Sequence, residues 1–452
     1  MNGKLKAKPG DKIKVVLIKQ EYTGIFLESS ESGIILIKLD SGYNIGFNKK
    51  DILDIEVLEN SKEEAPLGVP QNTEVRGKKE LSLKKDSGKP NIAMIITGGT
   101  IAARLNPKKG GVDWLDTPES FFKIYPGLFD KVNIAKLEIP FMKASEDMDF
   151  KDWQKIARLA EKLLNDSNIK GLIITHGTDF LHYTSAALSF FLRDLNKPVV
   201  LTYSQRSIDR ASSDANLNLQ CSALAAISDI AEVMLVGHAS SNDDYCYAFP
   251  GTKVRKMHSS KRDAFKAVNA KPFARIFPAL LSVPSGTALQ GNKIERISDY
   301  NLRNKGKVKL DAKFEEKVAL VKIYPGQDPD ILDYYVKKKY KGIVLEMCGL
   351  GHAPTARARK SWIKKLKEVQ KKGLIICAAS QTIYGRLDPL VYSNGIELMN
   401  TGIIYLQDML AETAFVKLGW VLGHNEWVKN KEIVKEKMLK NISHELNDRL
   451  EE

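Results

Sequence analysis

The stretch NIAMIITGGTIA, residues 91–102, decides the fold of this chain. Its apolar run at 92–96 is typical of a strand that is buried on both faces of a sheet. In open α/β sheets, ligands bind beyond the carboxyl ends of the strands, and the glycines of the following turn let the backbone come close to a bound molecule. We therefore expect the hydroxyl of Thr100 to face such a site. The alternative is an ordinary strand-to-helix turn in which Thr100 only caps the helix.

A second turn of the same kind occurs in ITHGTD at residues 174–179, after the apolar run 172–174. A threonine hydroxyl is a poor nucleophile at neutral pH and needs a base or an electropositive neighbour to activate it, while a carboxylate beside it can hold a substrate ammonium group. Thr178 and Asp179 suit these two tasks. His176 can serve as a base, but a histidine inside a tight turn more often orients the loop through hydrogen bonds, and we favour that structural role.

A third segment, GTKVRKMHSSKRDAF at residues 251–265, is strongly basic. A lysine that is buried beside a threonine hydroxyl has its pKa lowered by desolvation, and it can then act as a base or a proton shuttle. The other interpretation is a basic patch that binds nucleic acid. The spacing alone does not decide whether Lys253, Lys256 or Lys261 turns inward.

The residues around these segments predict an α/β fold. Apolar runs typical of buried strands alternate with amphipathic helical stretches such as 151–166, which indicates a doubly wound, mainly parallel sheet. The further strand runs are 199–201, 233–236, 343–345 and 374–377. We expect a larger N-terminal α/β lobe over 91–290 and a smaller C-terminal α/β lobe over 291–424. A C-terminal helix over 425–452 should pack its apolar stripe on the body or on a partner.

The first 90 residues have a different character. Short apolar alternations broken by turn residues predict a small antiparallel β-barrel over 1–60. Residues 61–90 are polar, lack periodicity and carry Pro and Gly at both ends, which indicates a linker. Small barrels bind RNA or protein or serve only as docking modules, and no run of aromatic residues here identifies a base-stacking face.

Composition narrows the class of protein. The chain has 452 residues, 43% apolar and 27% charged, so it is long enough for two or three domains and has an ordinary globular composition. The net charge of +14 suggests an acidic partner, nucleic acid first, although scattered surface lysines would give the same excess. No apolar segment follows the N-terminus and no apolar run reaches the roughly 18 residues of a membrane-spanning helix, so we expect a cytoplasmic protein with no membrane contact.

The sequence lacks cofactor signatures. Neither GxGxxG nor GxxxxGK[ST] is complete, CxxC and HExxH do not occur, and the seven histidines do not pair at metal-ligand spacing. We therefore expect no phosphate loop and no metal on this chain. The cysteines are widely separated, and we expect all of them to be reduced core residues: Cys221, Cys246, Cys348 and Cys377.

Three motifs together resemble the L-asparaginase/glutaminase family: TGGTIA at 97–102, ITHGTD at 174–179, and VxK followed by AFK within 254–266. Members of this family are threonine amidohydrolases with two α/β domains, and the likeness extends over about residues 90–419. It includes ASEDM at 144–148, where the family holds the α-carboxylate and amine of its substrate.

The resemblance implies a role for each matching residue. The catalytic set is Thr100, Thr178, Asp179 and Lys256, and the substrate-binding set is Gly99, Ser145, Glu146 and Gly177. Thr100 is then the nucleophile that forms an acyl-enzyme, Lys256 moves protons beside Thr178, and backbone amides of the turns hold the oxyanion. The family commonly carries a tyrosine on a mobile lid about a dozen residues after the first threonine. This chain reads GGVDW at 110–114 instead, which leaves the activator of Thr100 open.

The N-terminal barrel with its linker, and the basic segment 251–265, resemble the glutaminase subunits of archaeal tRNA-dependent amidotransferases, a branch of the same family. This resemblance implies that the chain releases ammonia from glutamine without a cofactor of its own. A partner, the E subunit, would bind Glu-tRNA(Gln), use ATP and Mg²⁺, and accept the ammonia through an internal channel.

The quaternary structure and the alternative functions follow from the same resemblance. Family members form homodimers through the α/β domains. With this chain as the D subunit and its partner as the E subunit, that implies an assembly of two copies of each, D2E2. One alternative is a stand-alone L-asparaginase/glutaminase with an accessory domain. The other is a catalytically silent RNA-binding scaffold, against which the complete set of site residues counts.

Overall fold

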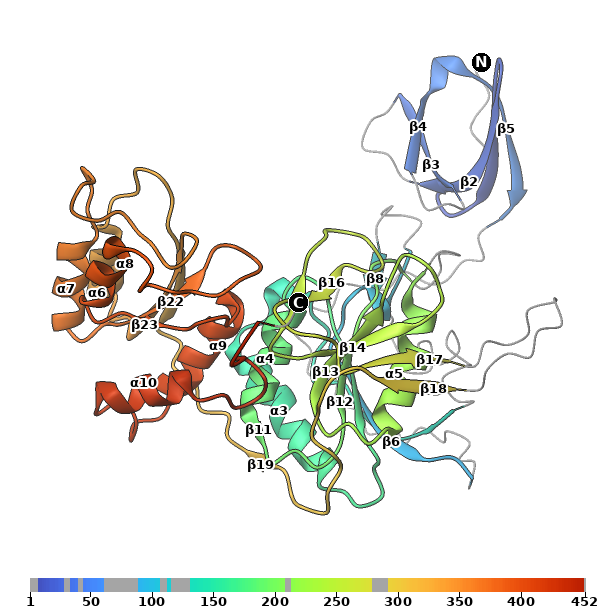
Figure 1. Ribbon diagram of the computed structural model, residues 1–452. Helices are drawn as coiled ribbons and strands as arrows, with labels where there is room; N and C mark the ends of the chain where they lie inside the picture. Colours follow the sequence, from blue (N-terminus) through green and yellow to red (C-terminus); the bar gives the residue numbers. More distant parts are fainter. Residues whose placement is uncertain are drawn as a thin grey trace.

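The computed structural model shows an N-terminal β domain followed by a larger and a smaller α/β lobe (Figure 1). The structure describes residues 7–27, 33–39, 44–60, 88–105, 112–114, 131–207, 213–278 and 292–450. Most of the predicted linker, residues 61–87, therefore lies outside the described residues. None of the described helices is long and apolar enough to cross a membrane.

The N-terminal domain is a five-stranded antiparallel sheet with the strand order β4-β3-β2-β1-β5. Its elements are β1 (Lys12–Leu17), β2 (Glu21–Leu27), β3 (Ile34–Leu39), β4 (Asn44–Asn48), the 3-10 turn η1 (Lys49–Asp51) and β5 (Ile52–Glu59). Alternate side chains of β1, Ile13 and Val15, are buried, as expected for strands with one face on a core. The sheet is curled, and its apolar residues form a core of their own (Figure 1).

The larger lobe is built on an eight-stranded sheet with the order β18-β17-β14-β13-β12-β10-β6-β9. Its strands are β6 (Asn91–Ile96), β9 (Asn133–Glu138), β10 (Leu172–Thr175), β12 (Val199–Thr202), β13 (Val233–His238), β14 (Cys246–Pro250), β17 (Ala274–Phe277) and β18 (Lys293–Arg296). The pairs from β9 to β13 are parallel, and those from β13 to β18 are antiparallel. The expectation of a mainly parallel sheet is thus confirmed, with an antiparallel edge.

Helices cover both faces of this sheet, which is why its strands are continuously apolar. The helices are α3 (Phe150–Leu164), α4 (Leu181–Phe191) and α5 (Ala215–Ile227). Ala93 and Ile95 of β6 share one core with α3 and α4, whereas Ile92 and Met94 share another with α5. Figure 1 shows α5 on the opposite side of the strands from α3 and α4.

The smaller lobe contains a parallel sheet with the order β20-β21-β22-β23. Its strands are β20 (Val318–Lys322), β21 (Gly342–Met347), β22 (Ile375–Ser380) and β23 (Ile404–Tyr405), and its helices are α6 (Ile331–Lys337), α7 (Ile363–Lys371), α8 (Ser393–Met399), α9 (Ala411–Leu422) and α10 (Lys431–Leu439). Helix α9 packs against α4 of the larger lobe. A short pairing of β11 (Leu192–Arg193) with β19 (Lys309–Leu310) joins the larger lobe to the connecting segment.

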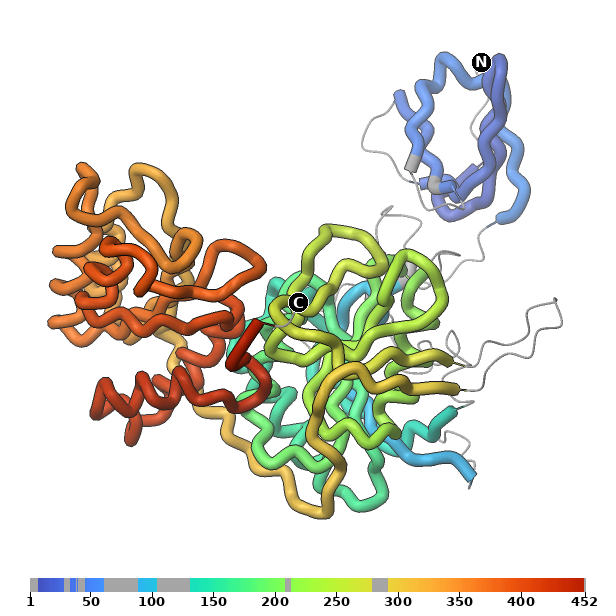
Figure 2. Tube along the Cα trace, in the orientation of Figure 1, coloured from blue at the N-terminus to red at the C-terminus, as the bar shows by residue number. Residues whose placement is uncertain are grey.

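The predicted C-terminal helix over 425–452 is too long. Helix α10 ends at Leu439, and residues 440–450 run without helix back to the larger lobe, where the chain ends in Figure 2. The carboxylate of Glu445 is fully buried and accepts hydrogen bonds from the Lys417 ammonium and from the backbone N–H of Ser443. Local periodicity could not predict this arrangement, because the buried Glu445 carboxylate is paired with Lys417 of α9, a residue far from it in the sequence.

The predicted environment of the cysteines is wrong at one position. Cys221, Cys246 and Cys377 are buried free thiols, as expected, but Cys348 is exposed. It directly follows the end of β21, and its backbone pairs with His352 in a tight turn at the surface. The apolar run before Cys348 belongs to the strand, and the strand ends one residue before the cysteine.

Candidate active site

The two threonine-containing turns lie side by side. Strands β6 and β10 are parallel neighbours, and Ile96 pairs with Thr175, so both strands end at the same edge of the sheet. The hydroxyl of Thr97 donates to the carbonyl of Thr175 at 2.7 Å and ties the two turns together. Gly99, with φ of 83°, lies against the second turn so closely that a Cβ would stand 2.5 Å from the backbone N of Gly177. Only glycine fits this position.

Thr100 does not cap a helix. After Gly99 the chain makes a single 3-10 turn, η2 (Thr100–Ala102), and enters a hairpin of β7 (Ala103–Leu105) and β8 (Val112–Trp114). The alternative of a strand-to-helix turn is therefore excluded. Among the described residues, the Thr100 hydroxyl has no hydrogen-bond partner, and its side chain is half-buried. The hydroxyl is thus available to a ligand at the carboxyl edge of the sheet.

Lys256 meets the second turn. Strands β15 (Val254–Lys256) and β16 (Phe265–Ala267) form a hairpin, and Lys256 stands at its end opposite Phe265. Its Nζ donates to Thr178 Oγ1 at 2.8 Å and forms an ion pair with Asp179 Oδ1 at 2.9 Å. The Lys256 side chain is 12% exposed and that of Asp179 is 58% exposed, so the carboxylate faces open space while the ammonium is held inside. The three side chains give a hydroxyl with a nitrogen in position to exchange its proton.

The third part of the site follows β9. Ser145, in the 3-10 turn η3 (Ser145–Asp147), is buried directly against Gly177, where a Cβ would stand 2.9 Å from the Ser145 backbone N. Ser145 Oγ accepts a hydrogen bond from the Phe180 backbone N at 3.2 Å and donates to Glu146 Oε2 at 3.2 Å. Glu146 is exposed beside it. The structure thus brings all of the predicted site residues into one contiguous group, with carboxylates on its open side.

His176 has the structural role that the sequence favoured. Its ring is fully buried, Nδ1 lies 2.7 Å from the Gly177 carbonyl, and Nε2 lies 2.9 Å from Thr184 Oγ1. A carbonyl can only accept, so Nδ1 carries the hydrogen and Nε2 accepts from the threonine hydroxyl. Burial lowers the pKa of His176 to about 4, although the hydrogen bond to Gly177 opposes this shift. The imidazole is therefore neutral at physiological pH, with both nitrogens occupied.

The structure also decides between the three lysines of the basic segment. Lys261 is exposed, and Lys253 is completely buried on the far side of β15, where its Nζ lies 2.6 Å from Asp408 Oδ2. Arg255 points the same way and pairs with Glu412 at 2.7 Å. Sequence reasoning missed these two ion pairs. The period-two alternation of a strand was the available signal, because it separates residues 253 and 255 from residue 256.

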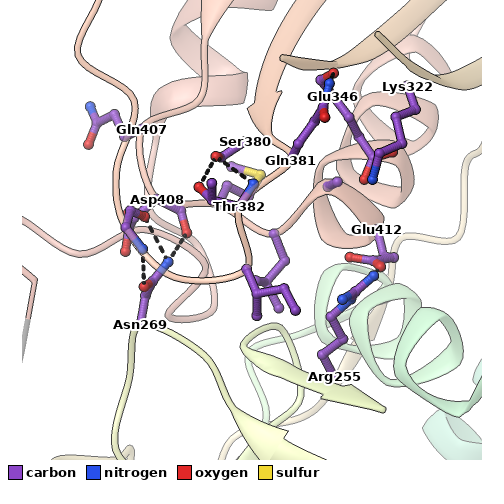
Figure 3. A pocket seen from close by; sticks show the side chains of 15 residues that line it. Arg255, Asn269, Lys322, Glu346, Ser380, Gln381, Thr382, Gln407, Asp408 and Glu412 are labelled. Carbon is purple, nitrogen blue, oxygen red and sulfur yellow. Dashed lines mark hydrogen bonds and ion pairs between the residues drawn. The ribbon is translucent and has the colours of Figure 1, made fainter. Parts of the chain in front are cut away.

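A polar cavity of about 140 Å³ lies on that far side, at the junction of the lobes (Figure 3). Its lining includes the Arg255–Glu412 pair, Asp408, Lys322 and Glu346. Burial raises the pKa of Glu346, and Lys322 opposes the shift. None of the predicted site residues is among those that line this cavity, although Arg255, which lines it, directly precedes Lys256 in β15. Within the described part of the chain, no group of three or more His, Cys, Asp or Glu side chains could hold a metal ion.

Family models match all three parts of the chain: GatD N-terminal domain over residues 7–58, Asparaginase, N-terminal over 91–284, and Glutaminase/Asparaginase C-terminal domain over 317–435. The thermostable L-asparaginase from Thermococcus kodakarensis has a similar structure, with a TM-score of 0.67 and 26% identity over 79% of this chain and 100% of that one. L-asparaginase I from Vibrio cholerae gives a TM-score of 0.64 and 26% identity over 79% and 99%. The fold and the site therefore define an asparaginase-type, two-lobed amidohydrolase with an added N-terminal domain.

Relatives that match over nearly their whole length narrow this class. The D subunit of glutamyl-tRNA(Gln) amidotransferase from Pyrococcus furiosus is 44% identical over 445 residues, which cover 97% of this chain and 94% of that protein. The corresponding D subunit from Methanococcus maripaludis is 38% identical over 442 residues, which cover 97% and 98%. The chain belongs to the family of glutamyl-tRNA(Gln) amidotransferase D subunits. The resemblance read from the motifs is thereby confirmed.

Proposed function

We propose that this chain hydrolyses glutamine and supplies the ammonia with which an amidotransferase converts Glu-tRNA(Gln) to Gln-tRNA(Gln). The observation that carries the proposal is the contact of Lys256 Nζ with both Thr178 Oγ1 and Asp179 Oδ1, in a turn that lies against Gly99, the residue before Thr100. These groups supply what amide hydrolysis needs: a nucleophile, a proton carrier and a carboxylate for the substrate ammonium.

The proposed reaction has two steps. The Thr100 oxygen attacks the side-chain carbonyl of glutamine, the backbone amides of Gly99 and Gly177 hold the oxyanion, and the C–N bond breaks. Ammonia leaves with a proton that passes through the Lys256–Thr178 pair. Water then cleaves the ester, which releases glutamate and restores the Thr100 hydroxyl.

The head group of glutamine is an α-ammonium and an α-carboxylate, and the open side of the site offers partners for both. The exposed carboxylates of Asp179 and Glu146 suit the ammonium, and the polar groups around Ser145 suit the carboxylate. Neither carboxylate would assist a substrate that lacks the free α-amino group. This supports a small zwitterionic amino acid as the substrate of this chain.

The remaining chemistry belongs to a partner in our proposal. The E subunit binds Glu-tRNA(Gln), activates its γ-carboxylate with ATP and Mg²⁺, and receives the ammonia. The chain described here would need no cofactor of its own for its share of the reaction. The full-length similarity to D subunits supports such a partner, because their name describes one subunit of a larger enzyme.

We further propose that two copies of the chain associate through the α/β lobes and give a D2E2 assembly. The segment between β22 and the middle of α8 supports this, because it presents a group of exposed large apolar side chains. They are Ile383, Tyr384, Leu390, Val391, Tyr392 and Ile396. Large exposed apolar patches on the surface of a soluble protein are typical of interaction sites.

The proposal is tested by measuring ammonia release from glutamine and from asparagine, first with the chain alone and then with the E subunit and Glu-tRNA(Gln). Thr178→Ala and Lys256→Ala should each reduce glutamine-dependent transamidation by roughly 10²- to 10⁴-fold, because the proton path is cut. Transamidation with added ammonium chloride should be unchanged. Lys261→Ala, which removes an exposed lysine of the same segment, is the control and should keep full activity.

Two results would contradict the proposal. Rapid asparagine hydrolysis by the isolated chain, unaffected by the partner, would favour the stand-alone asparaginase that the similarity to the Thermococcus enzyme also allows. Loss of ammonia-dependent transamidation in Thr178→Ala would mean that the site does more than release ammonia.

A further inference from the structure

The segment that leads to Lys256 is attached to the smaller lobe at three positions: two residues directly before β15 and one residue within it. The carbonyl of Thr252 accepts from Thr413 Oγ1 at 2.7 Å. Lys253 and Arg255 then pair with two carboxylates of the segment that begins α9, Asp408 at 2.6 Å and Glu412 at 2.7 Å. The residue that follows these attachments is Lys256.

The middle attachment is completely buried. The side chains of Lys253 and Asp408 are both 0% exposed, and Lys253 Nζ also donates to the Asp408 backbone carbonyl at 3.0 Å. A buried ion pair adds little net stability over an apolar pair of the same size, because desolvation of both charges offsets their attraction. It does fix geometry, since neither charge can leave its partner without a large penalty. The pair therefore holds the backbone of β15 at a defined distance from α9.

The C-terminal strap, residues 440–450, closes this pair from the other side. The Asn447 backbone N donates to Asp408 Oδ1 at 3.1 Å, and Asn447 Nδ2 donates to Asp408 Oδ2 at 3.0 Å and to the Asn269 carbonyl. The Arg386 guanidinium donates to the carbonyl of Asn447 at 3.0 Å. Both oxygens of the Asp408 carboxylate are thus held, one by the strap alone and the other by Lys253 and the strap together.

We infer that Lys253 and Asp408, locked by Asn447, are positioning residues that place Lys256 against Thr178. The inference rests on the proton-transfer role proposed for Lys256. Lys253 lies three residues before Lys256 and directly before the short strand β15. A shift of the Lys253–Asp408 ion pair would therefore also move the Nζ atom of Lys256. A displacement of about 1 Å in a reacting group can cost up to about a hundredfold in rate.

A second buried pair provides a matched control. Lys417 Nζ lies 2.6 Å from Glu445 Oε1, both side chains are 0% exposed, and Lys417 belongs to α9. This pair also joins the smaller lobe to the strap, but it does not contact β15. Removing both charges from either pair is therefore the same chemical change at the same degree of burial. Only the Lys253–Asp408 pair is attached directly to the segment of Lys256, whereas Glu445 reaches it through Ser443, whose carbonyl accepts from Thr252 Oγ1.

The test compares Lys253→Met/Asp408→Asn with Lys417→Met/Glu445→Gln in the full-length chain with its partner subunit. The amide side chains can still accept from the backbone N–H groups of the strap, so both variants should fold. We expect Lys253→Met/Asp408→Asn to lose roughly tenfold or more in kcat for glutamine with KM within about twofold. The control should keep the wild-type kcat at temperatures below its melting transition, whatever its loss of thermal stability.

A crystal structure of each variant gives a readout that does not depend on activity. The distance between Lys256 Nζ and Thr178 Oγ1, 2.8 Å in the wild type, should lengthen in Lys253→Met/Asp408→Asn and stay unchanged in the control. An unchanged distance together with control-like kcat would overturn the inference. If the wild type itself released no ammonia from glutamine, the proposed function would fail, and the measured distance alone would decide the positioning role.

Discussion

At the scale of single residues, the basic segment separates two lysines by their surroundings. Lys253 and Lys256 are three positions apart in one segment, yet Lys253 is buried in an ion pair with Asp408 and Lys256 donates to Thr178. Burial lowers the pKa of Lys253, and the charge of Asp408 opposes that shift. Residue type alone would assign either lysine to proton transfer. The partner that each nitrogen meets decides between them.

The first residue-scale prediction concerns which threonine becomes acylated. A glutamine analogue with a diazoketone in place of the carboxamide should alkylate Thr100, because Thr178 is already bonded to Lys256 whereas no described residue occupies the Thr100 hydroxyl. Mass spectrometry should show the added mass on the wild type and on Thr100→Ser, and no added mass on Thr100→Ala. If the label maps instead to the peptide that contains Thr178, Thr178 is the nucleophile and the prediction for Thr100 is wrong.

The second residue-scale prediction concerns acid stability. The pKa of His176 is lowered by burial to about 4, below its ordinary value of 6.5. As the pH falls below 6.5, the His176 imidazole is therefore protonated in the unfolded chain but stays neutral in the folded chain. This difference decreases the free energy of unfolding by up to about 3 kcal/mol by pH 4. The loss is absent above pH 6.5, where both states are neutral.

Urea unfolding at pH 7.5 and at pH 5 measures this effect. His176→Asn keeps a donor toward the Gly177 carbonyl and should show a smaller drop in midpoint between the two pH values than the wild type. Burial also lowers the pKa of His182 to about 4, so part of the drop should remain. His258→Asn, at an exposed ring, is the control, and an equal drop in all three proteins would contradict the assignment.

At the scale of elements, the turns after β6, β9 and β10 form the site because their backbones touch. Gly99 contacts Gly177, and Gly177 contacts Ser145, so three turns far apart in sequence fit into one another without side chains between them. The hairpin of β7 and β8 then starts just after Thr100, whereas β10 and β12 are each followed by a helix. Because a hairpin and not a helix follows β6, the Thr100 hydroxyl does not cap a helix.

Gly99→Ala tests the turn contact. The substitution places a Cβ 2.5 Å from the backbone of the second turn at a φ of 83°. It should reduce stability by roughly 2 kcal/mol or more and abolish glutaminase activity, because backbone must move on both sides of Thr100. Gly373→Ala is the matched control, since its φ of 91° is also positive but, apart from its chain neighbours, no atom of the described residues lies within 4 Å of the added Cβ.

Chemical denaturation and ammonia release check both glycine variants. Gly373→Ala should lose only about 1 kcal/mol, the strain of a non-glycine residue at positive φ, and should retain activity. Equal losses of stability and activity in the two variants would mean that strain, and not the contact between turns, explains the requirement for glycine.

At the scale of the whole molecule, the C-terminal strap connects the smaller lobe to the larger lobe next to β15. The strap leaves the smaller lobe after α10 and ends beside the larger one, as Figure 2 shows in red. Ser443 alone contacts two parts of the larger lobe: its carbonyl accepts from Thr252 Oγ1 at 2.6 Å, and its hydroxyl donates to the Ser189 carbonyl at 2.9 Å.

The net charge of +14 is not needed to bind a small zwitterion, so we assign it to the tRNA-containing assembly of the proposal.

The proposed homodimer leads to a prediction at the same scale. Tyr384 and Leu390 are 59% and 64% exposed in the single chain. If the segment forms the dimer contact, Tyr384→Asp/Leu390→Asp should raise the dimer dissociation constant by roughly a thousandfold, about 4 kcal/mol, because unpaired carboxylates would be buried. Ile18→Asp, at an 80% exposed position of the N-terminal domain, should leave the dimer intact.

Light scattering coupled to size-exclusion chromatography reports the mass of each protein. A wild-type chain that elutes as a monomer, or a double variant that remains a dimer, would contradict this contact surface. Circular dichroism of the variants controls for loss of fold, since both substitutions lie at the surface.

The sequence by itself determined the buried strands, the helices that cover them and the chemistry of each turn, because these depend on local periodicity and residue type. The motifs at strand ends, through the family that they resemble, also gave a set of candidate site residues that the fold brings together. The tertiary structure alone decided which lysine reaches Thr178, that Thr100 enters a hairpin, and that the last residues leave the helix to lock Asp408. Each of these depends on a contact between residues far apart in the chain, and local patterns carry no information about which distant partner satisfies a buried charge or fills the space beside a glycine.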